Sequence, residues 1–105
     1  MPHLIKVAQA ADIPTGGRIV VAVDDIEIAV FNVDNEQFYA VEDICSHDGG
    51  PLSEGALLDG VQVECPRHGA RFDLRSGRAL TMPAFEPITA YPVIVRGDDL
   101  YLDMD

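Results

Sequence analysis

The feature that most constrains this chain is a pair of short boxes, each of which holds one cysteine and one histidine. Cys45-Ser46-His47 forms the first box and Cys65-Pro66-Arg67-His68 forms the second, with 17 residues between His47 and Cys65. Each box is too short for its two side chains to point far apart, so each can present one sulfur and one nitrogen to a common centre. Glycines follow both boxes closely, where a backbone must bend tightly. A common centre would require the fold to bring two distant loops together.

Three readings compete for these four residues. Structural zinc is chemically possible, although zinc sites usually begin with two closely spaced cysteines, and here each thiol is paired with a histidine. A disulfide between Cys45 and Cys65, or two unrelated buried cysteines, leaves both histidines unexplained. A nucleophilic cysteine–histidine dyad needs only one residue of each type, so the second pair would be an accident.

Length and charge exclude several classes of function. A chain of 105 residues is the size of one domain, so we expect residues 1–105 to form a single unit. The net charge of −11, with 18 acidic and 7 basic residues, argues against nucleic acid as a partner. No apolar run approaches the roughly 20 residues that span a bilayer, and the first residues do not resemble a secretion signal. We therefore expect a soluble, cytoplasmic protein that binds no membrane.

The charges are distributed unevenly. Residues 1–64 hold 12 acidic and 2 basic residues, whereas residues 65–105 hold 6 acidic residues and 5 arginines. Four of the arginines fall close together, at Arg67, Arg71, Arg75 and Arg78. Such a pattern is typical either of a solvated surface or of a surface that steers a protein partner.

Short segments rich in valine, isoleucine, phenylalanine and tyrosine recur between turn signals, which predicts an antiparallel all-β domain. The expected strands are residues 4–7, 18–23, 26–32, 37–41, 61–64, 70–73, 88–96 and 100–102. Two stretches interrupt this rhythm: residues 43–60, which are rich in glycine, and residues 81–87, which contain two prolines. We expect both to be functional loops beside one sandwich or barrel.

The complete boxes resemble those of the Rieske family. They read Cys45-Ser46-His47-Asp48-Gly49-Gly50-Pro51-Leu52 and Cys65-Pro66-Arg67-His68-Gly69-Ala70-Arg71-Phe72-Asp73. The resemblance implies a Rieske-like antiparallel β sandwich or barrel with a cluster-binding subdomain formed by two ligand loops. It also implies one [2Fe-2S] cluster, with Cys45 and Cys65 on one iron and His47 and His68 on the other. Pro83 and Phe85 would belong to a third loop that covers the cluster.

The neighbours of the ligands indicate the type of Rieske protein. High-potential respiratory members carry hydroxyl groups at the positions of Ala70 and Phe72, and bridging cysteines at the positions that look like Gly50 and Arg67. None of those groups is present here, and hydrogen bonds to the cluster sulfurs raise the potential. The resemblance therefore implies a low-potential, ferredoxin-like member.

The function implied by the resemblance is one-electron transfer without substrate chemistry. The chain has three histidines, so once two bind the cluster only His3 is left, and the second iron site of a ring-hydroxylating oxygenase cannot be built. The expected partners are a flavin-containing reductase as donor and an oxygenase or other acceptor, met transiently. Two alternatives remain open: an accessory subunit of a nitrite reductase or iron–sulfur assembly system, and a structural zinc domain.

Overall fold

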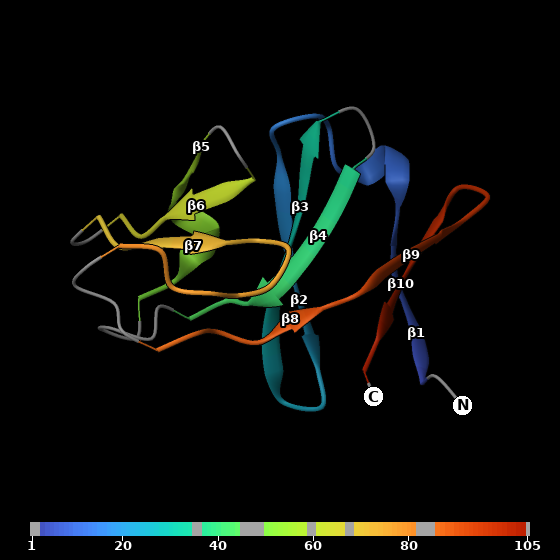
Figure 1. The fold of residues 1–105 in the computed structure, drawn as a ribbon. Coiled ribbons are helices and arrows are strands. Elements are labelled where there is room, and N and C mark those ends of the chain that lie inside the picture. Colours follow the sequence, from blue (N-terminus) through green and yellow to red (C-terminus); the bar gives the residue numbers. More distant parts are fainter. Residues whose placement is uncertain are drawn as a thin grey trace.

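The computed structural model of the chain describes residues 3–34, 37–44, 50–58, 61–66, 69–81 and 86–104. In this part of the chain the strands form three antiparallel sheets (Figure 1). The first sheet has the strand order β1-β10-β9, the second β2-β3-β4-β8 and the third β5-β6-β7. The elements are β1 (Leu4–Gln9), η1 (Ala10–Asp12), β2 (Arg18–Val23), β3 (Ile26–Asp34), β4 (Gln37–Glu42), η2 (Leu52–Glu54), β5 (Ala56–Leu58), β6 (Gln62–Glu64), β7 (Arg71–Asp73), β8 (Ala90–Tyr91), β9 (Val93–Arg96) and β10 (Asp99–Asp103).

The β2-β3-β4-β8 sheet lies in the middle, with the β5-β6-β7 sheet on one side and the β1-β10-β9 sheet on the other (Figure 1). Its strand β3 is buried on both faces, because residues 28–31 are fully inaccessible to solvent. Ala29 and Phe31 belong to the core shared with the β5-β6-β7 sheet, whereas Ile28 and Val30 belong to the core shared with the β1-β10-β9 sheet. A nearly continuous apolar run is what a strand covered on both faces requires.

Tight turns fix the register of the hairpins. In the β2–β3 hairpin Val23 pairs with Ile26, and the two residues between them, Asp24 and Asp25, have φ angles of 51° and 66°. Two consecutive positive φ angles are typical of the two-residue turn that matches the twist of a hairpin, and aspartate tolerates them better than most residues. The sequence-based turn at this position is confirmed.

The expected strand pattern is correct in most of the chain and wrong in two places. The expected strand over residues 88–96 is two strands, β8 and β9, which pair with different sheets on either side of Pro92. Proline cannot donate a ladder hydrogen bond, so the chain changes sheets there. The stretch over residues 43–60, expected as a loop without strands, contains η2 and β5, and β5 pairs with β6.

Within the described part of the chain, no helix is long and apolar enough to cross a membrane.

Candidate metal centre

The structure describes one of the four expected ligands. Cys65 follows β6 directly, whereas Cys45, His47 and His68 lie outside the described residues, as do Arg67, Pro83 and Phe85. The expected convergence of the two boxes therefore stays a prediction. The segments that flank the boxes are described, and they indicate how the chain brings the boxes together.

Cys65 lies at one end of the β6–β7 hairpin. Its amide nitrogen donates to the Ala70 carbonyl at 2.7 Å, and its carbonyl accepts from the Gly69 amide at 3.1 Å. Gly69 has a φ of 77°, a conformation that glycine adopts without the strain of a side chain. Next along the ladder Glu64 pairs with Arg71, and their side chains form an ion pair at 3.1 Å. Both the amide and the carbonyl of Cys65, the first residue of the second box, are therefore fixed by hydrogen bonds to the chain that leaves the box.

The surroundings of Cys65 are apolar. Cys65 is 1% exposed and belongs to the same hydrophobic core as Leu52, Ala70 and Phe72, each of which is 0% exposed. Leu52 comes from η2, in the segment that follows the first box, so this core joins the chain around both boxes. Neither Ala70 nor Phe72 carries a hydroxyl group that could donate to a sulfur.

The segments on either side of the first box are joined by one carboxylate. Asp43, which is 9% exposed, accepts a hydrogen bond from the Ser53 amide at 2.6 Å and another from the Ser53 hydroxyl at 2.9 Å. The Asp43 amide donates to the Glu27 carbonyl at 2.8 Å. The chain that enters the first box is therefore attached both to β3 and to the chain that leaves the box.

An arginine from the central sheet reaches the same segment. Arg18 on β2 donates to the carbonyl oxygens of Ser53 and Gly55. Sequence reasoning missed Arg18, Asp43 and Ser53, since 35 residues separate Arg18 from Ser53 and no motif links them. For Arg18, the sequence offers one signal, a single basic residue at the start of an apolar strand.

The chain on either side of residues 82–85 is attached to the β7 segment. Arg71 donates from its amide to the Thr81 hydroxyl at 3.0 Å, and the Ile88 amide donates to the Gly77 carbonyl at 2.8 Å. A side chain at Gly77 would overlap the Ile88 carbonyl oxygen, so glycine is required for this approach. Pro83 and Phe85 of the expected third loop lie outside the described residues, but its flanks contact β7 at Arg71 and the turn after β7 at Gly77.

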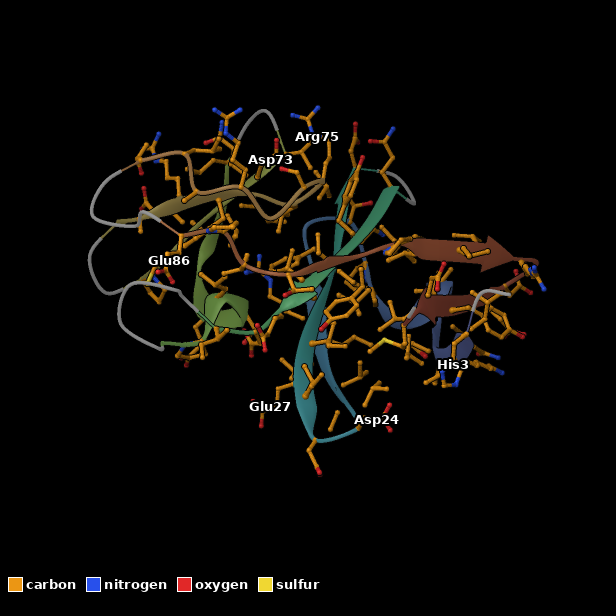
Figure 2. All side chains as sticks on the ribbon, turned by 60° about the horizontal axis from the view of Figure 1, so that its bottom comes forward. His3, Asp24, Glu27, Asp73, Arg75 and Glu86 are labelled. Atoms are coloured by element: carbon orange, nitrogen blue, oxygen red, sulfur yellow. The ribbon has the colours of Figure 1, made fainter. Side chains whose placement is uncertain are left out.

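Charge is arranged differently on the two sides of the molecule. Asp73 accepts from the Arg75 amide at 2.8 Å and from the Arg75 guanidinium at 3.2 Å, and chiefly this side-chain hydrogen bond lowers the pKa of Asp73. Figure 2 shows this pair on the hairpin side, whereas Asp24 and Glu27 lie at the tip of the β2–β3 hairpin, away from it. The Asp73–Arg75 pair thus offsets one negative charge at the end of the β6–β7 hairpin away from Cys65, and the Glu64–Arg71 pair offsets one beside Cys65.

An open hollow of about 300 Å³ lies at the other end of the β6–β7 hairpin from Cys65. Tyr39, Leu74, Arg75 and Tyr91 are among the residues that line it. Burial, with the nearby Glu42 charge as a smaller cause, raises the pKa of Tyr91. Because Leu74 and Arg75 follow the end of β7 opposite to Cys65, this hollow is separate from the candidate metal centre.

The donor chemistry fits an iron–sulfur cluster. A thiol that is 1% exposed among apolar side chains is protected from solvent, and a thiolate there needs a cation as a partner. Two thiolates balance the charge of an oxidised two-iron, two-sulfide core, and two neutral imidazoles complete the ligation of its irons. The residues present therefore fit the group that the boxes imply.

Comparisons with known proteins agree with this geometry. The family model described as the Rieske [2Fe-2S] domain matches residues 3–92. The 3-phenylpropionate/cinnamic acid dioxygenase ferredoxin subunit of Escherichia coli strain K12 is 45% identical over 100 residues, which cover 95% of this chain and 92% of that protein.

Two solved structures are similar over nearly the whole chain. The ferredoxin of carbazole 1,9a-dioxygenase from Nocardioides aromaticivorans IC177 has a TM-score of 0.90 and 31% identity, over 95% of this chain and 96% of that one. A chain in the complex of reduced oxygenase and oxidized ferredoxin of carbazole 1,9a-dioxygenase has a TM-score of 0.85 and 37% identity, over 95% and 92% of the two chains. The expected fold class is confirmed, and the chain belongs to the Rieske [2Fe-2S] domain family, whose cofactor is one [2Fe-2S] cluster.

Proposed function

We propose that this chain is a low-potential one-electron carrier of the ferredoxin type and not an enzyme. The observation that carries the proposal is the match to dioxygenase ferredoxins over 95% of this chain and over 92% to 96% of theirs. A carrier of this kind consists of little more than the cluster domain itself. In this proposal residues 1–105 form one domain, which the contribution of β3 to both buried cores supports.

Cys45, His47, Cys65 and His68 hold the cluster in this proposal, with both cysteines on one iron and both histidines on the other. Burial of Cys65 and the attachment of Asp43 to Ser53 around the first box support this ligand set. When bound, the cluster takes up and releases one electron. Replacing two thiolates by two imidazoles raises the potential to roughly −150 to +300 mV, compared with about −400 mV for plant-type ferredoxins. The lack of a side-chain hydroxyl at Ala70 and at Phe72 supports a potential toward the lower part of that range.

The donor in this proposal is a flavin-containing reductase and the acceptor is an oxygenase, both met transiently in the cytoplasm. The known complex between the ferredoxin and the oxygenase of carbazole 1,9a-dioxygenase supports the acceptor. Nucleic acid and membrane are not partners, in keeping with the net charge of −11. An accessory subunit of a nitrite reductase or of an iron–sulfur assembly system has less support, because the relatives described above are ferredoxins of oxygenase systems.

The ligand assignment is tested by replacing each of the four residues with alanine. Each replacement should abolish the visible absorption of the cluster and the electron paramagnetic resonance signal of the reduced protein. His3→Ala is the matched control, because His3 is exposed and lies on the far side of the molecule from the β5-β6-β7 sheet (Figure 2), and it should retain both signals. A colourless wild-type protein loaded with zinc would refute the cluster.

The carrier function is tested by stopped-flow spectroscopy with an oxygenase and a reductase from an aromatic-ring dioxygenase system. The reductase should reduce the protein, and the oxygenase should reoxidise it, both with rates that fall as salt is added. A stable complex with another subunit, without exchange between reductase and oxygenase, would instead support the accessory-subunit alternative.

A further inference from the structure

Arg18 connects two sheets of the molecule. It lies on β2 in the central sheet, opposite Phe31 in the β2–β3 pairing, and its guanidinium carbon is 5.0 Å from the centroid of the Phe31 ring. From there one of its terminal nitrogens donates to the Ser53 carbonyl at 3.2 Å and to the Gly55 carbonyl, while the other donates to the Gly16 carbonyl at 3.2 Å. The guanidinium is therefore held by stacking and by three carbonyl oxygens.

Ser53 and Gly55, whose carbonyl groups bind Arg18, contact the residues that precede the two boxes. Ser53 binds Asp43 through its amide and hydroxyl, and Asp43 is two residues before Cys45. Gly55 lies so close to the Glu64 carbonyl that a side chain there would overlap it, and Glu64 immediately precedes Cys65. A displacement of residues 53–55 would therefore be transmitted to both segments that carry the cysteines.

The chemistry of the contact requires arginine in particular. A guanidinium offers several N–H donors in a fixed plane and can stack on an aromatic ring while it donates, whereas an ammonium is a compact charge that cannot do both. Burial lowers the pKa of Arg18, but an arginine side chain stays charged at any pH at which the protein folds. The contact is thus a permanent, charge-assisted bridge between the central sheet and the segment between the two boxes.

We propose that Arg18 is a positioning residue for the cluster: by binding the carbonyl oxygens of Ser53 and Gly55, it fixes the segment from which both cysteine boxes are presented. The inference rests on the proposed ligand set. It concerns a residue outside both boxes, and it assigns to Arg18 no direct contact with the cluster.

The test compares Arg18→Gln and Arg18→Lys in the cluster-loaded protein. Three properties are measured: the rate at which the visible absorption disappears in the presence of an iron chelator, the line shape of the paramagnetic resonance spectrum of the reduced protein, and the midpoint potential. In both variants we expect cluster loss at least tenfold faster than in the wild type, together with a broadened spectrum and a shifted potential. Because lysine keeps the charge but lacks the planar array of donors, Arg18→Lys should not restore wild-type behaviour.

Two controls separate positioning from a general effect. Arg96→Gln, on β9 in the distant sheet, removes an equal charge and should leave all three properties unchanged. Ile28→Val makes a small cavity in the core that does not contain Cys65, so it should lower the urea midpoint without altering the spectrum. Arg18 variants that keep the wild-type spectrum and potential, and lose the cluster no faster than Ile28→Val does, would overturn the proposal. A wild-type protein without a cluster would instead refute the proposed function itself.

Discussion

The Asp43 carboxylate accepts two hydrogen bonds from a single residue, one from the amide and one from the hydroxyl of Ser53. This pair closes the loop that contains the first box. Removing the acceptor leaves two donors, the amide and the hydroxyl of Ser53, without their partner in a partly buried place, so Asp43→Ala should lower the free energy of unfolding by about 1–3 kcal/mol. Ser53→Ala, which removes only the hydroxyl bond, should cost about 0.5–1.5 kcal/mol. Urea unfolding monitored by circular dichroism measures both changes.

Ser76→Ala is the control for this pair, because the Ser76 hydroxyl accepts a hydrogen bond from the Arg78 amide at an exposed turn. It should change the free energy of unfolding by less than about 0.5 kcal/mol. If Asp43→Ala is no more destabilising than Ser76→Ala, the carboxylate does not hold the loop closed.

Gly77 and Gly97 form a second matched pair. Both have positive φ angles, 79° and 61°, but a side chain at Gly77 would overlap the Ile88 carbonyl, whereas at Gly97 it would meet open space. Gly97→Ala should therefore cost only the conformational penalty, about 1–2 kcal/mol. Gly77→Ala should cost about 1–3 kcal/mol more, because the backbone of residues 77 and 88 must separate. Equal thermal unfolding midpoints for the two variants would contradict the close approach.

Sequence patterns predicted the strands well where turn chemistry and alternation agree, as in the β2–β3 hairpin with its two aspartates. They failed at Pro92 because a long apolar run does not reveal that its two halves pair with different sheets. They also missed β5, since three residues after a glycine-rich loop are too few to produce a period.

The candidate site, too, has features that the sequence predicts and features that it does not. The boxes identified the family, because ligand types and spacing follow from the chemistry of the cluster. The contacts of Arg18 with Ser53 and Gly55 could not be predicted, because they join residues far apart in the chain, and carbonyl acceptors are available at every residue. Which carbonyl an arginine binds is decided by the tertiary fold alone.

A hydroxyl group at position 72 should raise the reduction potential. Phe72 is 0% exposed and packs in the same hydrophobic core as Cys65. The hydroxyl group added by Phe72→Tyr would therefore lie in the low-dielectric surroundings of the site. A new hydrogen bond of about 0.5–1.5 kcal/mol to the reduced cluster corresponds to a rise of roughly 20–65 mV for one electron. Protein-film voltammetry measures the midpoint directly.

Phe38→Tyr is the control for Phe72→Tyr, because Phe38 belongs to the other buried core. It makes the same chemical change away from Cys65 and should leave the midpoint unchanged. No rise, or a fall, in the Phe72→Tyr midpoint would refute the role of position 72.

The Asp73–Arg75 pair should make stability depend on pH in a defined direction. The hydrogen bonds from Arg75 hold the pKa of Asp73 below its ordinary value of 3.8 in the folded protein. The folded state therefore binds this proton less readily than the unfolded state, so the stabilisation is fully present above the ordinary pKa and is lost as the pH falls through the folded pKa. Asp73→Asn should consequently be less stable than the wild type at pH 7, and the difference in urea midpoint should shrink below about pH 4.

Arg75→Gln supplies the second arm of this test, because it removes the guanidinium donors and leaves the carboxylate with its backbone donors. It should reduce the stability at pH 7 and remove most of the same pH-dependent difference, because the side-chain hydrogen bond is the largest cause of the lowered Asp73 pKa. The two single variants should not be additive in the double variant, as expected for groups that act as one pair. The pair is largely exposed on the Arg75 side, so high salt should reduce the wild-type advantage at pH 7 as well. A difference between wild type and Asp73→Asn that stays constant from pH 7 to pH 3 would show that Asp73 stabilises the hairpin without its charge.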